Sequence, residues 1–131
     1  MVDRTVIAEF PSPEFLCKQA SSYNREAVAP DQPGWFSNAD TSFFDGYEDV
    51  DGRREWIAVD VDGPGAIVRG WITQQDFRGT VRIYLDGSDT PVYAAKANQL
   101  VGGSTITGSP LSKVVGWNGQ NLYMPIPFSQ H

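Results

Sequence analysis

The sequence predicts an all-β domain of the jelly-roll or β-sandwich class, with long loops and at most one or two short helices. Apolar residues occupy every second position in segments 56–61 and 81–86, a pattern typical of strands that bury one face. Thirteen glycines and nine prolines divide the chain into short segments, as expected of a protein built from strands and turns. We expect Val61, Ile83 and Leu85 to lie in the core.

Breaks at glycine and proline set the expected elements. The first half should open with a strand-like stretch over residues 5–10. The segment over 14–25 is ambiguous and fits a short helix or extended chain. Residues 29–54 should form loops with short strands at most. In the second half the expected elements are strands near 55–62, 66–73, 79–86, 91–94 and 122–128, a brief helix over 94–100 that ends at Gly102-Gly103, and a loop over 102–119. The closing strand contains two prolines that cannot donate to a ladder, so it should lie at an edge or have one unpaired side.

Length, composition and charge bound the possible functions. A chain of 131 residues with 40% hydrophobic content is expected to form a single β-sandwich domain over residues 1–131. Its net charge of -6 and the absence of a basic cluster in the sequence argue against a nucleic-acid partner. No apolar run approaches the roughly 18 residues of a membrane span, so no membrane partner is expected. Residues 1–10 do not have the pattern of a secretory signal, and the location, cytoplasm or exported, stays open.

Metal and nucleophile chemistry find little support in the sequence. Cys17 is the single cysteine and His131 the single histidine, which excludes an intrachain disulfide and a thiolate metal site. We expect Cys17 to be a small buried residue. The acidic run 45–52 is similar to a calcium-binding loop, but Tyr47 and Ala58 stand where the first and twelfth ligands belong. We therefore expect neither a metal nor a cofactor.

Five sequence blocks follow one another in an informative order. They are CKQASSYNR (17–25), PGWFSNAD (33–40), DGPG with the following Arg69 and Trp71 (62–71), RIYLD ahead of Thr90-Pro91 (82–91), and NLYMPIPF (121–128). Together these blocks cover most of the chain and resemble the N-terminal jelly-roll part of glycoside hydrolase family 172. The chain departs from the family pattern at Asn24, where an acidic residue is more usual.

The resemblance implies a function as well as a fold. The chain would be the first jelly roll of a double jelly-roll unit in a glycoside hydrolase that acts on furanosides, with fructofuranosyl or arabinofuranosyl linkages. Such an enzyme would use a retaining mechanism with two carboxylates. None of the five glutamates (Glu9, Glu14, Glu26, Glu48, Glu55) matches a catalytic glutamate of the family, so the catalytic residues are unknown and are expected outside the chain, which alone should be inactive.

The resemblance also implies partners. These are a carbohydrate substrate, a second chain or the remainder of the same polypeptide that completes the double jelly roll, and further copies in a trimer or hexamer. Only residues 129–131 follow the expected closing strand. We therefore expect this strand to need a neighbour from another segment or chain.

Two clusters are candidate sugar-binding residues. Trp35, Asn38 and Asp40 combine an aromatic platform, an amide and a carboxylate in one loop, and Tyr23 and Arg25 form a second cluster. Aromatic faces contact the CH surfaces of sugars, and a few planar polar groups bind the hydroxyls, as in other small-molecule sites. The alternative is that Trp35 fills one end of the sandwich while Asn38 and Asp40 bond the local backbone as turn residues.

Three further tryptophan and arginine positions leave the function open. Arg69 and Trp71 share one face of an expected strand, where a structural stack is the simpler interpretation. Trp117, in a glycine-rich loop, fits either the wall of a cleft or the cover of an exposed edge. Three classes of function remain: a glycosidase, a carbohydrate-binding jelly roll without catalysis, and a structural or assembly subunit.

Overall fold

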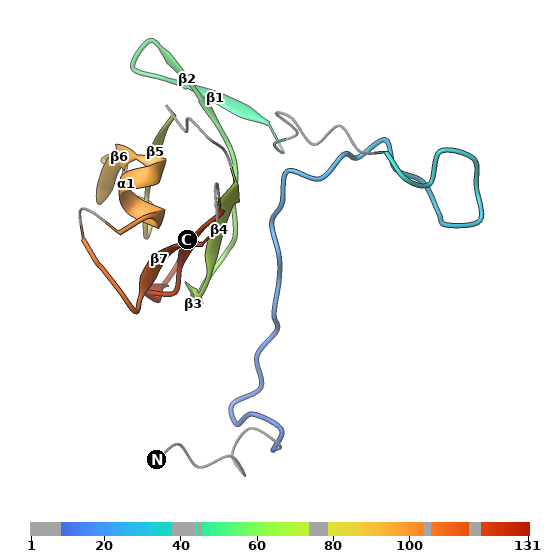
Figure 1. Ribbon diagram of the computed structural model, residues 1–131. Helices are drawn as coiled ribbons and strands as arrows, with labels where there is room; N and C mark the ends of the chain where they lie inside the picture. Colours follow the sequence, from blue (N-terminus) through green and yellow to red (C-terminus); the bar gives the residue numbers. More distant parts are fainter. Residues whose placement is uncertain (1–8, 38–43, 45, 74–78, 104–105, 116–118) are drawn as a thin grey trace. The chain divides into compact units, whose positions relative to one another are not determined.

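The computed structural model describes residues 9–37, 44, 46–73, 79–103, 106–115 and 119–131 (Figure 1). The chain divides into two compact units, one ending at Val59 and the other beginning at Asp60. Within the described residues there are nine β-strands and a single short helix, and every strand pairing is antiparallel. The predicted all-β class is therefore confirmed. In this described part of the chain, no helix is long and apolar enough to cross a membrane.

The first unit contains irregular chain followed by one β-hairpin. Residues 9–37 form neither helix nor strand, so the ambiguous segment 14–25 is irregular chain, while most of the expected strand over 5–10 lies outside the described residues. Strands β1 (Tyr47–Val50) and β2 (Arg53–Trp56) pair with each other. Asp51 and Gly52 between them have φ values of 50° and 78°, as a type I′ hairpin turn requires of its two central residues.

The second unit contains three small sheets and the helix. The two-stranded sheets are β3 (Gly65–Ile67) with β9 (Ile126–Phe128), and β5 (Thr80–Ile83) with β6 (Tyr93–Lys96). The three-stranded sheet has the order β4 (Gly70–Thr73), β8 (Gly119–Leu122), β7 (Ser112–Val115). Helix α1 (Ala97–Val101) contacts strands β4, β5, β6 and β8. It lies beside β5 and β6 in Figure 1.

Several expected elements occur with different bounds. The strands near 79–86 and 91–94 are β5 and β6, and the helix over 94–100 is α1, which ends at Gly102. The single strand expected over 66–73 is two strands, because β3 pairs with β9 whereas β4 pairs with β8. The closing strand likewise divides into β8 and β9. Within the described residues β9 pairs only with β3, so the prediction of one unpaired side is confirmed.

Two expectations about segments are wrong. The strand expected over 55–62 starts earlier, because the Asp51-Gly52 turn pairs Arg53 with Val50, and it stops at Trp56, the partner of Tyr47. The loop expected over 102–119 contains β7. This strand pairs with β8 from Ser112↔Leu122 to Val115↔Gly119, and its apolar residues Val114 and Val115 are more than half exposed. This strand has no buried apolar face, so its sequence does not show the alternating pattern from which a strand can be predicted.

The core of the second unit is small and centres on the helix. Leu100 and Val101 of α1 and Leu122 of β8 are 3%, 6% and 3% exposed and form one apolar cluster. Six half-buried side chains pack against this cluster: Ile72, Val81, Ile83, Tyr93, Met124 and Ile126. Ile83 therefore faces the core as predicted, and Val61 and Leu85 are half-buried. The alternation in segment 81–86 predicted the face of β5 correctly.

The end of the helix packs closely against β7. Gly103 has a φ of 80°, and a Cβ atom added there would lie 1.8 Å from the hydroxyl oxygen of Ser112. Ser112 itself is 2% exposed. Only a residue without a side chain allows the backbone after α1 to pass so near to β7, so Gly103 fixes the position of the helix against the three-stranded sheet.

The expectation of a buried Cys17 is wrong. The side chain is exposed, and so are its neighbours Phe15 and Leu16, at 68% and 86%. All three belong to the irregular segment 9–37, where no helix or strand among the described residues supplies a surface on which a thiol could pack. The residue type predicted burial, but local structure decides it.

The carboxylate of Asp86 joins the segment after β9 to the loop after β5. One oxygen of Asp86 accepts hydrogen bonds from the backbone N–H groups of Ser129 and Gln130, each at 2.7 Å. The backbone N–H of Asp86 donates to the carbonyl of His131 at 2.5 Å, and that of Gly63 donates to the carbonyl of Gln130 at 2.6 Å. The bonds from Gln130 and Ser129 hold the pKa of the Asp86 carboxyl below its ordinary value of 3.8.

The Leu100–Val101–Leu122 cluster predicts a large difference between two truncations in the same sheet. Leu122→Ala should lower the free energy of unfolding by about 2–5 kcal/mol, because it opens a cavity in the core. Val114→Ala, at a position 52% exposed, should lower it by less than about 1 kcal/mol. Urea titrations of both variants measure the difference, and equal losses would show that the core lies elsewhere.

The Asp86 network predicts a stability contribution that depends on pH. Because the pKa is lowered in the folded state, the contribution is present above the unfolded value near 3.8 and disappears as the pH falls through the lower folded value. Asp86→Asn should therefore be less stable than the wild type at pH 7, and the two should converge in strong acid. Asp89→Asn, in the same loop, is the control. If Asp89→Asn were less stable than the wild type at pH 7 and equal to it in acid, while Asp86→Asn showed no such change, the assignment would be contradicted.

Candidate functional site

The predicted aromatic platform at Trp35 is exposed in the structure. Backbone bonds from Gln32 to Ala29 (2.9 Å) and from Trp35 to Gln32 (3.2 Å) form two successive turns that lead to the tryptophan. Its ring centroid lies 5.5 Å from that of Phe36, with an interplanar angle of 51°. The two side chains are 54% and 66% exposed. Trp35 is therefore available to a ligand within its unit, and the alternative in which it fills the end of the sandwich receives no support from its exposure.

The two polar partners predicted for Trp35 cannot be placed. Asn38 and Asp40 lie outside the described residues, as does Trp117. Ser37 is the last residue described in this loop, and its hydroxyl lies 3.5 Å from the carbonyl of Gly34. The structure thus shows that the ring of Trp35 is exposed, while the binding roles of Trp35, Asn38 and Asp40 stay predictions.

The second predicted cluster forms around a turn at Asn24. The Asn24 side-chain oxygen accepts a hydrogen bond from the backbone N–H of Glu26 at 2.9 Å, and Asn24 is only 5% exposed. Its carbonyl accepts a further bond from Ala27 at 3.2 Å. This is an Asx turn, for which asparagine and aspartate are both suited. The usual acidic residue at this position could form the same turn, so the departure at Asn24 preserves the local structure.

The Asn24 turn brings Tyr23 and Arg25 together. The Arg25 guanidinium carbon lies 4.7 Å from the centroid of the Tyr23 ring, and Arg25 also donates to the carbonyl of Ser21 at 3.4 Å. Tyr23 is 57% exposed. The pair presents an aromatic ring beside a planar donor at the surface, which is the combination that a sugar hydroxyl and an adjacent CH face can use.

In the second unit, Arg69 pairs with a tyrosine. Its guanidinium carbon lies 5.7 Å from the ring centroid of Tyr123. Tyr123 follows β8, whose Asn121 is the register partner of Trp71. Tyr123 is 45% exposed and Trp71 57% exposed. The arginine stack was expected on Trp71, and the described contact of Arg69 is with the ring of Tyr123 instead.

A further aromatic group on the β1–β2 hairpin was not predicted. Tyr47 and Trp56 are register partners, with ring centroids 5.6 Å apart and an edge-on angle of 68°. Phe44 lies 6.4 Å from Trp56, and the Arg54 guanidinium carbon lies 3.9 Å from the centroid of Tyr47. The signal that could have revealed this group is the Asp51-Gly52 hairpin turn with an aromatic residue at equal distance on each side.

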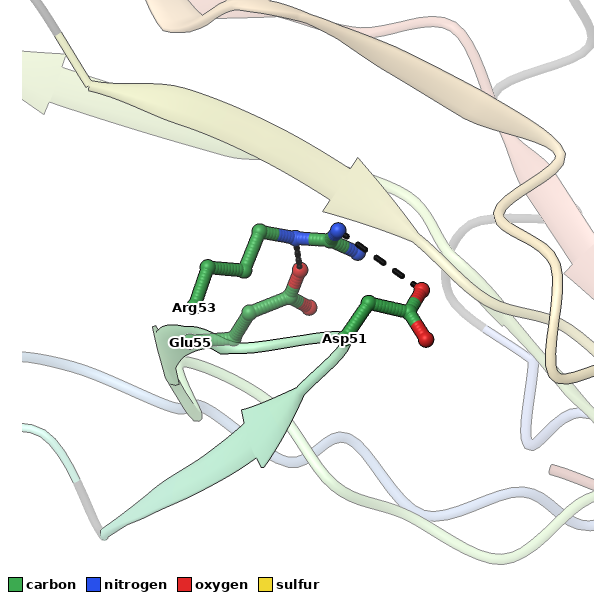
Figure 2. Close-up of polar contacts among 3 residues, drawn as sticks. All are labelled: Asp51, Arg53 and Glu55. Atoms are coloured by element: carbon green, nitrogen blue, oxygen red, sulfur yellow. Dashed lines mark hydrogen bonds and ion pairs between the residues drawn. The ribbon is translucent and has the colours of Figure 1, made fainter.

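The opposite face of the same hairpin carries paired charges. The Nε of Arg53 donates to Glu55 at 2.6 Å, and its terminal nitrogen lies 3.7 Å from Asp51 (Figure 2). The Glu55 side chain is 14% exposed and that of Asp51 84% exposed. Glu55 also lies directly across from Glu48, an arrangement that alone would destabilise the hairpin. The arginine offsets this repulsion, so the ion pairs have a structural role.

The described residues offer little for metal chemistry. Among residues 9–37, 44, 46–73, 79–103, 106–115 and 119–131, no three histidine, cysteine, aspartate or glutamate side chains come together as a metal site would need. His131 and Asp60 form a pair through Nε2 and a carboxylate oxygen. Both side chains are more than half exposed.

A comparison with protein families relates the chain to a known family. The family model described as the GH172 first beta-sandwich domain matches residues 13–131. The chain belongs to this family. Neither the curated proteins nor the solved structures contain a significant match to it. The match confirms the predicted resemblance and the β-sandwich class, and it identifies the chain as the N-terminal domain of a glycoside hydrolase family.

For this GH172 domain, the exposure of Trp35 predicts an effect on binding without an effect on folding. If the ring contacts sugar, Trp35→Ala should raise the dissociation constant for a furanosyl oligosaccharide between about threefold and tenfold. The melting temperature should change by no more than a few degrees. Phe10→Ala, at a position 98% exposed in the same segment, is the matched control. Asp40→Asn tests the same loop more gently, because it removes the charge and keeps the shape.

A destabilised Trp35→Ala variant whose folded fraction binds as tightly as the wild type would contradict this assignment. Calorimetric titration gives the affinity, and thermal unfolding followed by circular dichroism gives the melting temperature. Equal losses of affinity in Trp35→Ala and Phe10→Ala would also contradict it.

Proposed function

We propose that this domain is the sugar-binding first sandwich of a GH172 glycoside hydrolase that acts on fructofuranosyl or arabinofuranosyl linkages. The observation that carries the proposal is the family match over residues 13–131. In this proposal the enzyme retains the anomeric configuration, and its two catalytic carboxylates come from outside the chain. The domain then contributes substrate binding, and its own 131 residues do not suffice for turnover.

The surfaces of the first unit support a binding role. Trp35 and Tyr23 are more than half exposed, and Arg25 lies over the ring of Tyr23. Rings accompanied by planar donors suit a ligand that presents both CH groups and hydroxyls, as a furanoside does.

The carboxylates that the structure brings to a common partner are poorly suited to acid–base chemistry. Asp51 and Glu55 both contact Arg53. A retaining glycosidase needs one protonated and one ionised carboxyl on either side of the glycosidic bond. At this pair the guanidinium of Arg53 takes the place that the glycosidic oxygen would need. This arrangement supports the proposal that the catalytic pair lies elsewhere.

Exposed apolar residues support a further part of the proposal, namely that the domain is completed by another part of the protein. Phe10, Leu16 and Phe36 are 98%, 86% and 66% exposed in segment 9–37. Apolar side chains exposed in this way along one segment are typical of a surface that contacts another polypeptide. We propose that a second chain or the remainder of the polypeptide covers them, and that the completed units associate as a trimer or hexamer. The same exposure favours an assembly subunit as the second candidate function.

The proposal predicts complementation. The 131-residue chain alone should not hydrolyse aryl arabinofuranosides or fructofuranosides, whereas the chain joined to the second sandwich should hydrolyse at least one of them with retention. Release of the chromophore measures turnover, and nuclear magnetic resonance of the first product measures its anomeric configuration. The double variant Asp51→Asn/Glu55→Gln in the completed enzyme is the control for the hairpin carboxylates. This variant should keep the retaining activity.

Three results would contradict the proposal. Turnover by the isolated chain would place the catalytic groups within it. Glycan binding without turnover by the completed protein would favour a carbohydrate-binding module, and a defined oligomer without affinity for glycans would favour an assembly subunit. Sedimentation velocity determines the oligomer in the same samples.

A further inference from the structure

The two faces of the β1–β2 hairpin differ in what they expose. Because side chains alternate along a strand, Tyr47 and Asp49 share a face with their partners Trp56 and Arg54. On this face Tyr47 is 49% exposed and Trp56 54% exposed. On the other face, the Glu55 side chain is only 14% exposed and is bonded to an arginine. The tryptophan and tyrosine thus occupy the more accessible face of the hairpin.

The rings on this face form an ordered group. Trp56 is central, with the edge-on ring of Tyr47 at 5.6 Å and the more nearly parallel ring of Phe44 at 6.4 Å and 34°. Arg54 covers one face of Tyr47 at 3.9 Å, and its Nε lies 3.5 Å from a carboxylate oxygen of Asp49. We call these five residues the hairpin aromatic face. Rings held in this way lose little conformational freedom when a ligand binds.

We propose that the hairpin aromatic face binds a neutral sugar unit of a glycan. The indole of Trp56 contacts the CH surface of the sugar ring. The Arg54–Asp49 pair at its edge supplies N–H donors and carboxylate acceptors to neighbouring hydroxyls. This inference rests on the proposed function, because it takes the ligand to be a glycan, and it adds a second binding surface to the one around Trp35.

The charges of the hairpin select a neutral ligand. Residues 47–56 contain four acidic side chains (Glu48, Asp49, Asp51, Glu55) and two arginines (Arg53, Arg54), so their net charge is -2. Each arginine already lies within ion-pair distance of a carboxylate. A uronate, a sulfated sugar or a phosphate would approach an acidic surface whose cations are already countered. An uncharged, hydroxyl-rich ligand meets no such repulsion.

The size of the patch favours a sugar over a protein partner. An aromatic side chain buries 150–250 Å², so three rings with about half their surface exposed offer roughly 300 Å². A stable protein interface needs about 800 Å² from each partner. The hairpin aromatic face is also flanked by charged residues, whereas the centre of a protein interface is depleted of charge. One or two sugar units match this footprint.

The decisive experiment compares two tryptophans of similar exposure in the full chain. The probes are a neutral arabinofuranosyl oligosaccharide, a neutral fructofuranosyl oligosaccharide and polygalacturonate as the anionic comparison. Trp56→Ala should raise the dissociation constant for one of the neutral probes at least tenfold. Trp71→Ala, at a position 57% exposed on β4, should leave it within twofold. Trp56→Phe should restore most of the affinity, because it keeps an apolar ring.

A direct contact provides a test that requires no variant. Nuclear Overhauser effects between sugar CH protons and the Trp56 indole should appear in the wild-type chain, so a misfolded variant cannot decide the question. Binding of the neutral probe should change less than twofold between low and high salt, since screening affects charged ligands. Tighter binding of polygalacturonate, equal behaviour of the two tryptophan variants, or a dimer that dissociates only in Trp56→Ala would each overturn the proposal.

The hairpin inference and the proposed function fail in different ways. Loss of furanoside hydrolysis in the completed enzyme, with Trp56-dependent binding retained, would contradict only the proposed function. Conversely, hydrolysis of an aryl furanoside by the completed enzyme, with neutral-glycan binding that does not depend on Trp56, would contradict only the hairpin inference. Turnover that falls in parallel with Trp56-dependent binding would show that Trp56 belongs to the catalytic centre, which would overturn the assignment of a separate surface.

Discussion

The second unit depends on one apolar contact, the packing of helix α1 against strand β8. Leu100 and Val101 of the helix meet Leu122 of the strand, and the three are the members of the buried cluster. Half-buried side chains of β4, β5, β6 and β9 pack against these three residues. Because three small sheets share so few buried side chains, losing this contact would remove most of the apolar packing between them. The close approach of Gly103 to Ser112 is therefore a structural requirement.

The fold could be predicted from the sequence where the signal is local. The alternation in segment 81–86 found β5 and placed Ile83 against the core, and the glycine pair at 102–103 located the end of the helix. Strand β7 was missed because its position depends on β8, and its valines are exposed. The division of segment 66–73 was missed for a related reason. One continuous apolar pattern serves two strands with different partners, and a sequence pattern does not identify partners.

For the candidate site, too, the sequence reveals residues that are adjacent in the chain but not those brought together by strand pairing. Tyr23, Arg25 and Trp35 were predicted because aromatic and polar residues are adjacent in the sequence, and all three lie at the surface. The hairpin aromatic face was missed because Tyr47 and Trp56 are nine positions apart and are separated by charged residues. Only the register of the hairpin brings them together. Cys17 shows the opposite error, since a residue type that is usually buried lies in a segment that has nothing to pack against.

Among the described residues, each tyrosine that is about half exposed has an arginine side chain over its ring. Tyr23, Tyr47 and Tyr123 are 57%, 49% and 45% exposed, and each has a guanidinium over its ring, from Arg25, Arg54 and Arg69 respectively. Such a contact contributes about 0.5–1 kcal/mol at an exposed site. It offsets part of the cost of an exposed ring and leaves the rest of that ring to a ligand. The arginines thus help a domain with a small core to keep aromatic rings at its surface, as the proposed sugar-binding role would require.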